Sequence, residues 1–217
     1  MASRIVHQID ALEWLAAPTA LDGASVVTSL PDLRELPEFN LATWRQWFVR
    51  AAALVMTRTS DDAAAIFFQS DIRHEGLWID KGAMVQAAAE QTGLQLLFHQ
   101  IVCRRPAGTI TFNRASYSHL MGFSRRLVPN IARSTADVLP DGGHQPGSKS
   151  MGVKACLAAC RFVLNQTSTR IIVDPFCGLG TVLAVANHLG LDAIGVDRSA
   201  RMCKKARALS LDPRHLL

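Results

Sequence analysis

The chain has 217 residues, of which 49% are hydrophobic and 19% are charged, and it carries a net charge of +5. This composition excludes extensive disorder, supports a buried core without disulfides or structural metal, and permits an anionic partner such as nucleic acid. The sequence contains no apolar run of membrane-spanning length, and its first residues do not resemble a secretory signal. Five cysteines without a CxxC pair indicate reduced thiols, a cytoplasmic protein and no metal site.

Hydrophobic periodicity predicts strands that alternate with helices. In chain order, we expect a strand at 4–8, a helix at 10–17 before Pro18, a strand at 24–28, a helix at 41–57, a strand at 63–69, a helix at 81–91, strands at 94–104 and 116–124, a helix at 152–164, a strand at 170–173, a helix at 182–189, a strand at 192–196 and a helix at 199–209. This alternation favours an α/β fold with a mainly parallel sheet.

The stretch 126–151 has a different character, because prolines, glycines and scattered polar residues replace the periodic pattern. We expect a long loop or small insertion here, within a single domain that spans residues 1–217.

The strongest chemical signal is RIIVDPFCGLGTVLAVANHLGLDAIGVDRS, in which a buried strand ends in Asp174 and is followed by a glycine-rich turn and a helix. Gly178 and Gly180 allow the backbone to approach a ligand closely. Asp197 ends the next strand, 23 positions after Asp174, where a carboxylate suits two ribose hydroxyls. The pattern therefore predicts an adenosine-containing ligand above the carboxyl ends of parallel strands.

Two common adenosine ligands fit this turn poorly. The dinucleotide pattern G-x-G-x-x-G/A fails because Leu183 occupies the third small position, and no GxxxxGK[ST] phosphate loop is present. S-adenosylmethionine fits better, because its ammonium and sulfonium groups suit nearby carboxylates and it has no pyrophosphate.

DPFCGLGT followed by GVD resembles the first two motifs of class I S-adenosylmethionine-dependent methyltransferases that act on nucleic acid, namely DNA amino-methyltransferases and several RNA base methyltransferases. The position of these motifs late in the chain, the segment HQPGSKS at 144–150 and the opening IVHQIDALEWL resemble the circularly permuted order of N4/N6-type enzymes. The resemblance implies a Rossmann-like, seven-stranded, mainly parallel sheet with helices on both faces. It implies cofactor contacts from Asp10, Lys149, Asp174, Pro175, Phe176, Cys177, Gly178, Gly180, Thr181 and Asp197, with Asp10 near the adenine and Asp197 on the ribose.

The catalytic motif of the resembled group is (D/N/S)-P-P-(Y/F/W), whose aromatic residue stacks on the flipped target base. The matching position here reads Ser29-Leu30-Pro31-Asp32, so Leu30 and Asp32 depart from the pattern. We expect Ser29, Pro31 and Asp32 to form the catalytic site, with Ser29 or Asp32 orienting the acceptor or taking its proton. The alternative is a turn that ends the strand, with Asp32 capping the next segment.

Five further residues are candidates for substrate contact. Asp71 and Arg73 follow the strand at 63–69, where side chains of a parallel sheet face the crevice, although a solvated loop pair is an equal alternative. Arg104 and Arg125 belong to an arginine-rich region that suits phosphate contact, or else a solvated surface. Trp78 is placed either to stack on a base or to pack on a lid.

These features lead to three hypotheses. The first is a nucleic-acid base methyltransferase that uses S-adenosylmethionine, with RNA favoured over DNA because the chain is basic and has no large DNA-reading domain. The second is a methyltransferase for a small molecule or protein, suggested by the unusual S-L-P-D. The third is a non-catalytic descendant that binds nucleic acid.

Overall fold

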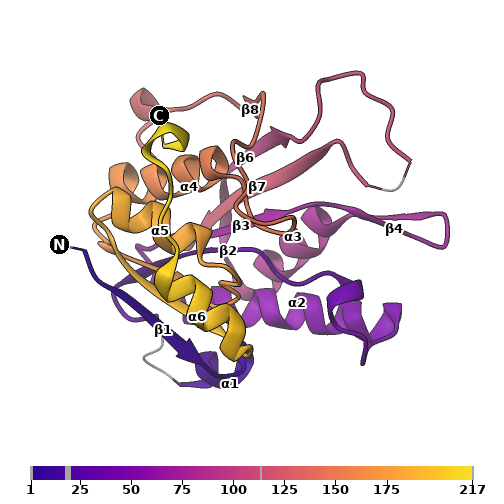
Figure 1. Cartoon of the computed structure of the whole chain (residues 1–217), viewed down its shortest axis with the longest axis horizontal. Coiled ribbons are helices and arrows are strands. Elements are labelled where there is room, and N and C mark those ends of the chain that lie inside the picture. Colours follow the sequence, from indigo (N-terminus) through magenta and orange to yellow (C-terminus); the bar gives the residue numbers. More distant parts are fainter. Residues whose placement is uncertain (1, 18–20, 113, 217) are drawn as a thin grey trace.

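The computed structural model describes residues 2–17, 21–112 and 114–216, and its largest element is a mixed sheet of eight strands (Figure 1). Their order across the sheet is β1-β10-β9-β2-β3-β7-β6-β8. In chain order they are β1 (Arg4–Gln8), β2 (Ala24–Thr28), β3 (Ala65–Gln69), β6 (Gln95–Cys103), β7 (Tyr117–Ser124), β8 (Val138–Leu139), β9 (Ile171–Asp174) and β10 (Asp192–Asp197). All run in one direction except β7, which is antiparallel to both β3 and β6.

The expected mainly parallel sheet is confirmed, and seven of its strands coincide with the predicted ones. The eighth, β8, is a two-residue edge strand inside the stretch 126–151. A further antiparallel hairpin, β4 (Ile72–His74) and β5 (Leu77–Ile79), forms between β3 and α3, where no element was predicted. The early strand β2 lies between β9 and β3, so the first half of the chain completes the sheet beside the glycine-rich turn, as the permuted order requires.

Helices cover both faces of the sheet. They are α1 (Ala11–Ala16), α2 (Leu41–Arg58), α3 (Lys81–Thr92), α4 (Val153–Gln166), α5 (Thr181–His188) and α6 (Ala200–Ala208). Helices α4, α5 and α6 share one core with Val27 and Ile66, whereas α1, α2 and α3 share the other with Val26 and Phe67. Alternate residues of β2 and β3 thus enter opposite cores, which explains why these strands are continuous apolar runs. None of the described helices is long and apolar enough to cross a membrane.

Local signals set the helix ends. The Asp10 carboxylate accepts the backbone N–H of Leu12 at 2.8 Å and begins α1, and Asp80 accepts that of Ala83 at 2.8 Å and begins α3. Gly93 ends α3 with a left-handed φ of 71°, which glycine adopts at little cost. Pro18, expected to end the first helix, lies outside the described residues.

The five neighbouring parallel strands β1, β10, β9, β2 and β3 bring their carboxyl ends to one edge of the sheet. Each is followed there, or ended, by one of the predicted site residues, in the order Asp10, Asp197, Asp174, Ser29 and Asp71. This edge is where parallel α/β sheets bind ligands.

Candidate active site

The turn between β9 and α5 requires both of its glycines. Gly178 has a φ of 50° and Gly180 a φ of 80°, in the left-handed region that side chains other than glycine rarely adopt. A Cβ on Gly180 would lie 2.8 Å from the Cβ and 2.9 Å from the Cα of Ala206 in α6, whereas a Cβ on Gly178 would meet no protein atom within 4 Å. Gly180 therefore serves helix packing, and Gly178 leaves room on the ligand side.

Asp174 is buried, at 4% exposure, and its Oδ1 accepts the Thr28 hydroxyl at 2.7 Å and the Phe176 backbone N–H at 3.1 Å. Burial raises the pKa of this carboxyl to about 7, because desolvation penalises the charged form more than these hydrogen bonds favour it. A cationic ligand group beside Asp174 would stabilise the carboxylate.

Asp197 ties the end of β10 to the turn. Its Oδ2 accepts the Gly178 backbone N–H at 3.1 Å and its Oδ1 accepts the Ser199 backbone N–H at 2.7 Å. Burial raises the pKa of Asp197 as well. Two backbone donors thus fix the carboxylate while lone pairs remain for ligand hydroxyls.

A cavity of about 600 Å³ opens above this turn and is called the first cavity below. Nine of the ten predicted cofactor residues line it, namely Asp10, Lys149, Asp174, Pro175, Phe176, Cys177, Gly178, Thr181 and Asp197. Gly180 does not, because its α carbon is turned toward α6. The hydroxyl of Thr181 is buried and has no hydrogen-bond partner among the described residues, as expected for a group that awaits a ligand.

Sequence reasoning missed Trp47 of α2, which also lines the first cavity. Its ring packs edge-on against Phe176, with ring centroids 6.0 Å apart and an interplanar angle of 78°. The tryptophan fits the apolar spacing of α2, so nothing in the pattern separates it from core residues. Lys149 reaches the cavity but forms an ion pair with Glu35 at 3.2 Å.

A second cavity, of about 170 Å³, adjoins the first. Both are lined by Ser29, Leu30, Glu35, Ser148, Lys149 and Ser150. Ser29 therefore lies between the two cavities, and its hydroxyl has no hydrogen-bond partner within the described part of the chain. The Pro31 carbonyl is already occupied, because it accepts the indole N–H of Trp44 at 3.3 Å.

Asp32 lines the second cavity and forms an ion pair with Lys81, the first residue of α3. The Lys81 side chain is 3% exposed and that of Asp32 is 33% exposed, so the pair is set in the cavity wall. The alternative interpretation of Asp32 describes its backbone correctly, since Asp32 precedes a short 3₁₀ turn (Leu33–Glu35) and its N–H donates to Glu35 Oε1 at 3.2 Å. The carboxylate itself faces Lys81, a partner that the sequence did not reveal.

Asp71 is the centre of a buried hydrogen-bond cluster rather than a free substrate ligand. It accepts the Lys81 backbone N–H at 2.8 Å, the Trp78 indole N–H at 3.2 Å and the Tyr117 hydroxyl at 3.3 Å, and it lies 3.1 Å from His119 Nε2. Four partners fill the acceptor capacity of a carboxylate. Asp71 thereby fixes the start of α3 and hence the partner of Asp32.

Of the remaining candidates for substrate contact, one lines the second cavity and two lie outside both cavities. Arg104 lines the second cavity, and burial together with nearby Arg114 lowers its pKa. Arg73 lies outside both cavities, exposed, with its guanidinium 5.0 Å from the Trp78 ring centroid. The expectation for Arg125 is corrected, because its guanidinium donates to the carbonyls of Met56 and Thr59 at the end of α2 and lines neither cavity.

The two parts of the stretch 126–151 contact different regions of the protein. Its first part packs against the end of α4, where the Asn130 N–H donates to Gln166 at 2.8 Å and Arg133 donates to the Asn165 carbonyl at 2.7 Å. Within this stretch, only Gln145 and residues 147–151 line the two cavities. The first part of the stretch thus lines neither of the two cavities.

A family of known proteins matches the part of the chain that forms the first cavity's glycine-rich turn. The DNA methylase family of the N6/N4 type matches residues 161–208, which contain the glycine-rich turn and Asp197. None of the curated proteins matches the chain in sequence. The family match confirms the resemblance for this part of the chain.

Solved structures confirm the methyltransferase fold over nearly the whole chain. A protein of Thermus thermophilus assigned as a DNA modification methylase has 18% identity and a TM-score of 0.72, with 94% of this chain and 93% of that chain covered. The same protein in complex with S-adenosyl-L-methionine has 18% identity and a TM-score of 0.71, with 95% and 94% covered. The PvuII DNA methyltransferase, which is cytosine-N4-specific, has 15% identity and a TM-score of 0.71, with 98% and 88% covered.

Proposed function

We propose that this chain is an S-adenosylmethionine-dependent methyltransferase that acts on an amino group of a nucleic-acid base, with DNA as the preferred nucleic acid. The observation that carries the proposal is the pair of adjoining cavities at the carboxyl edge of the sheet, with Ser29 between them. The first has the acids and the glycine turn that suit the cofactor, and the second receives the acceptor.

The residues of the first cavity fit S-adenosylmethionine. Asp197 would accept the ribose hydroxyls, Asp10 would lie near the adenine, and Asp174 would face the cationic end. The unpartnered Thr181 hydroxyl supports a polar ligand at the start of α5. When bound, S-adenosylmethionine supplies a methyl group already activated on a sulfonium, so positioning is the main task left to this chain.

The second cavity supplies that positioning. The Ser29 hydroxyl would accept an N–H of the acceptor amino group, and Asp32, which pairs with Lys81 in the wall of the second cavity, would accept the proton that the nitrogen loses as it gains the methyl group. The acceptor nitrogen would take the methyl group with its lone pair, and bound S-adenosylmethionine would supply the sulfur leaving group.

The RNA preference expected from the sequence is replaced by DNA in this proposal. The family that matches residues 161–208 is described as DNA methylase, and the similar structures named above carry DNA methylase or methyltransferase names. The net charge of +5 suits either nucleic acid, so it gives no preference for RNA.

The test is transfer of tritiated methyl from S-adenosylmethionine into amplified, unmodified DNA and into transcribed RNA of the same sequence. We expect label in DNA, loss of label with Asp197→Ala and retention of label with Asp192→Ala, a matched change at the opposite end of β10. Label in RNA alone would overturn the preference for DNA. Calorimetric binding of the cofactor without label in either pool would overturn the base acceptor, and failure to bind the cofactor would overturn the methyltransferase itself.

A further inference from the structure

Two segments project from the body of the protein beside the second cavity. One is the β4–β5 hairpin (residues 72–79), and the other is the loop between β6 and β7 (residues 104–116), called the arm loop below (Figure 1). A bridge between Ile72 and Arg114 joins them. Arg104 and Arg114, near the two ends of the arm loop, both line the second cavity. The two segments therefore extend the wall of the second cavity outward.

Large apolar side chains are exposed on both segments. Leu77 and Trp78 of the hairpin are 66% and 42% exposed, and Ile110 and Phe112 of the arm loop are 79% and 81% exposed. Trp78 and Phe112 are the aromatic members of the exposed large hydrophobic residues in the described part of the chain. Single exposed apolar residues are ordinary, but four on two segments that a backbone bridge joins indicate a contact surface.

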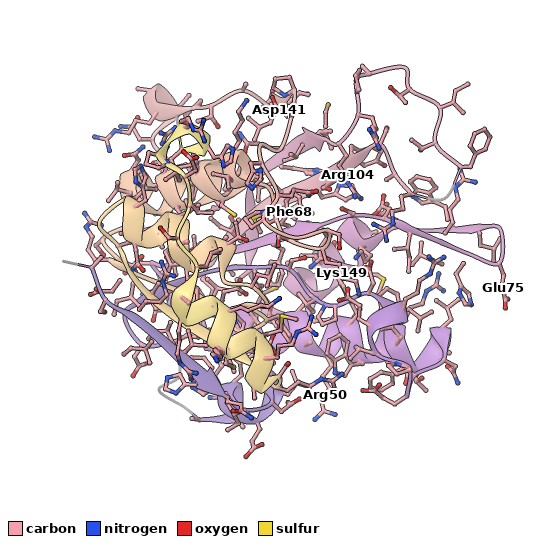
Figure 2. All side chains as sticks on the ribbon, in the orientation of Figure 1. Arg50, Phe68, Glu75, Arg104, Asp141 and Lys149 are labelled. Carbon is pink, nitrogen blue, oxygen red and sulfur yellow. The ribbon has the colours of Figure 1, made fainter. Side chains whose placement is uncertain are left out.

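The same two segments are basic. They contain four arginines, namely Arg73, Arg104, Arg105 and Arg114, and one acidic residue, Glu75, which lies at the tip of the hairpin (Figure 2). Within the described residues, none of the four arginines forms an ion pair with a carboxylate. Arg104 and Arg114 share the wall of the second cavity with Asp32, and the repulsion by Arg114 outweighs the attraction by Asp32, so an anion would stabilise Arg104 further.

We infer that the hairpin and the arm loop form a docking surface for an unpaired nucleic-acid strand, in which Trp78 and Phe112 stack on bases and Arg104 and Arg114 hold a phosphate next to the acceptor cavity. The inference rests on the proposed function, which it deepens by naming how the strand is held. Stacking on side chains requires base faces that a duplex keeps covered, whereas arginines contact phosphates in any strand. The first part of the stretch 126–151 packs against the end of α4 and does not line the second cavity.

Strand binding tests the inference independently of methyl transfer. The fluorescence anisotropy of a labelled 12-nucleotide DNA is measured with the strand single and with the strand in a duplex, between about 50 and 200 mM salt. We expect tighter binding of the single strand, and a loss of at least about fivefold in affinity for Phe112→Ser because one stacking contact is removed. Arg104→Gln is expected to lower the slope of log affinity against log salt by about 0.7–1.

Matched variants exist on other surfaces. Ile131→Ser removes an equally exposed apolar side chain from the stretch that packs on α4, and Arg50→Gln removes an exposed arginine from α2, which Figure 2 places apart from Arg104 and Glu75. Both should bind the strand as the wild type does. All four positions are on the surface or the cavity wall, and unchanged thermal unfolding would confirm that the variants are folded.

The outcomes separate this inference from the proposed function. Equal losses for Phe112→Ser and Ile131→Ser, preference for the duplex, or no strand binding by the wild type would each overturn the docking surface, the last in favour of a protein partner for the apolar residues. Methyl transfer to DNA could still occur in each case. Strand binding that depends on Phe112 and Arg104 without any methyl transfer would support the docking surface and overturn the proposed reaction.

Discussion

Gly180→Ala should destabilise the protein more than Gly190→Ala, a change at another glycine with a left-handed φ. Gly180 has a φ of 80°, and an added Cβ would lie 2.8–2.9 Å from Ala206 in α6. The left-handed conformation costs an alanine about 1–2 kcal/mol, and overpacking against a helix adds about 1–3 kcal/mol, for a total of about 2–5 kcal/mol. Gly190 has nearly the same φ, 78°, but no atom within 4 Å of an added Cβ, so Gly190→Ala should lose only the first contribution.

Urea unfolding of the two variants and the wild type measures this difference directly, because a shift in midpoint at constant slope reports stability. Gly178→Ala adds a third case, since Gly178 has a φ of 50° and space for a Cβ on the side of the first cavity. It should lose about as little stability as Gly190→Ala while weakening cofactor binding. Equal losses for Gly180→Ala and Gly190→Ala would refute the assignment of Gly180 to packing between α5 and α6.

Three further predictions concern buried or partly buried polar groups. The folded protein keeps the proton of Asp174 up to about pH 7, whereas the unfolded chain releases it above about 3.8, so wild-type stability should fall relative to Asp174→Asn as pH rises through this window, by an amount on the order of 4 kcal/mol in urea unfolding. Asp71→Ala leaves the Lys81 N–H and the Trp78 indole without an acceptor and should lower the free energy of unfolding by about 3 kcal/mol or more, whereas exposed Arg73→Ala should change it by less than about 0.5 kcal/mol. Arg125→Ala should lose about 1–3 kcal/mol of stability with unchanged strand binding, and weakened strand binding by a folded variant would contradict its placement at the end of α2.

Most of the fold could be predicted from the sequence because local patterning and long-range structure agree. Strands such as ASVVT and AIFFQ are buried on both faces, and such strands give unbroken apolar runs. Caps such as Asp80 and Gly93 set the ends of α3 within a residue or two. The β4–β5 hairpin escaped prediction because its strands have three residues each, which is too short for a period to be recognised.

The site was predictable where one short segment contains it and not where distant segments meet. Asp174, Gly178 and Asp197 lie within one strand–turn–helix–strand unit, so spacing alone indicated their arrangement. Lys81 is 49 positions from Asp32, and His119 is 48 positions from Asp71, so tertiary structure alone brings each pair together. Arg125 was misplaced because a cluster of arginines in the sequence does not give the direction in which each strand presents them.

Asp32 stands where the resembled motif has an aromatic residue, and this difference changes the wall of the second cavity. The Asp32 carboxylate pairs with Lys81, whose side chain is 3% exposed, and Asp71 fixes the backbone of that lysine. Asp32→Tyr restores the aromatic residue of the resembled motif but leaves the buried ammonium unpaired. Because Asp32 is partly exposed, the loss should fall below the roughly 3–5 kcal/mol of a fully buried pair.

Adding Lys81→Met to Asp32→Tyr removes the unpaired charge and should recover most of the lost stability, which urea unfolding of the single and double variants measures. The double variant is expected to regain stability without regaining methyl transfer, because the carboxylate proposed to take the acceptor proton is gone. An Asp32→Tyr variant as stable as the wild type would show that the ion pair does not hold the cavity wall. A double variant with full methyl transfer would remove Asp32 from the reaction and would assign the acceptor contact to Ser29 alone.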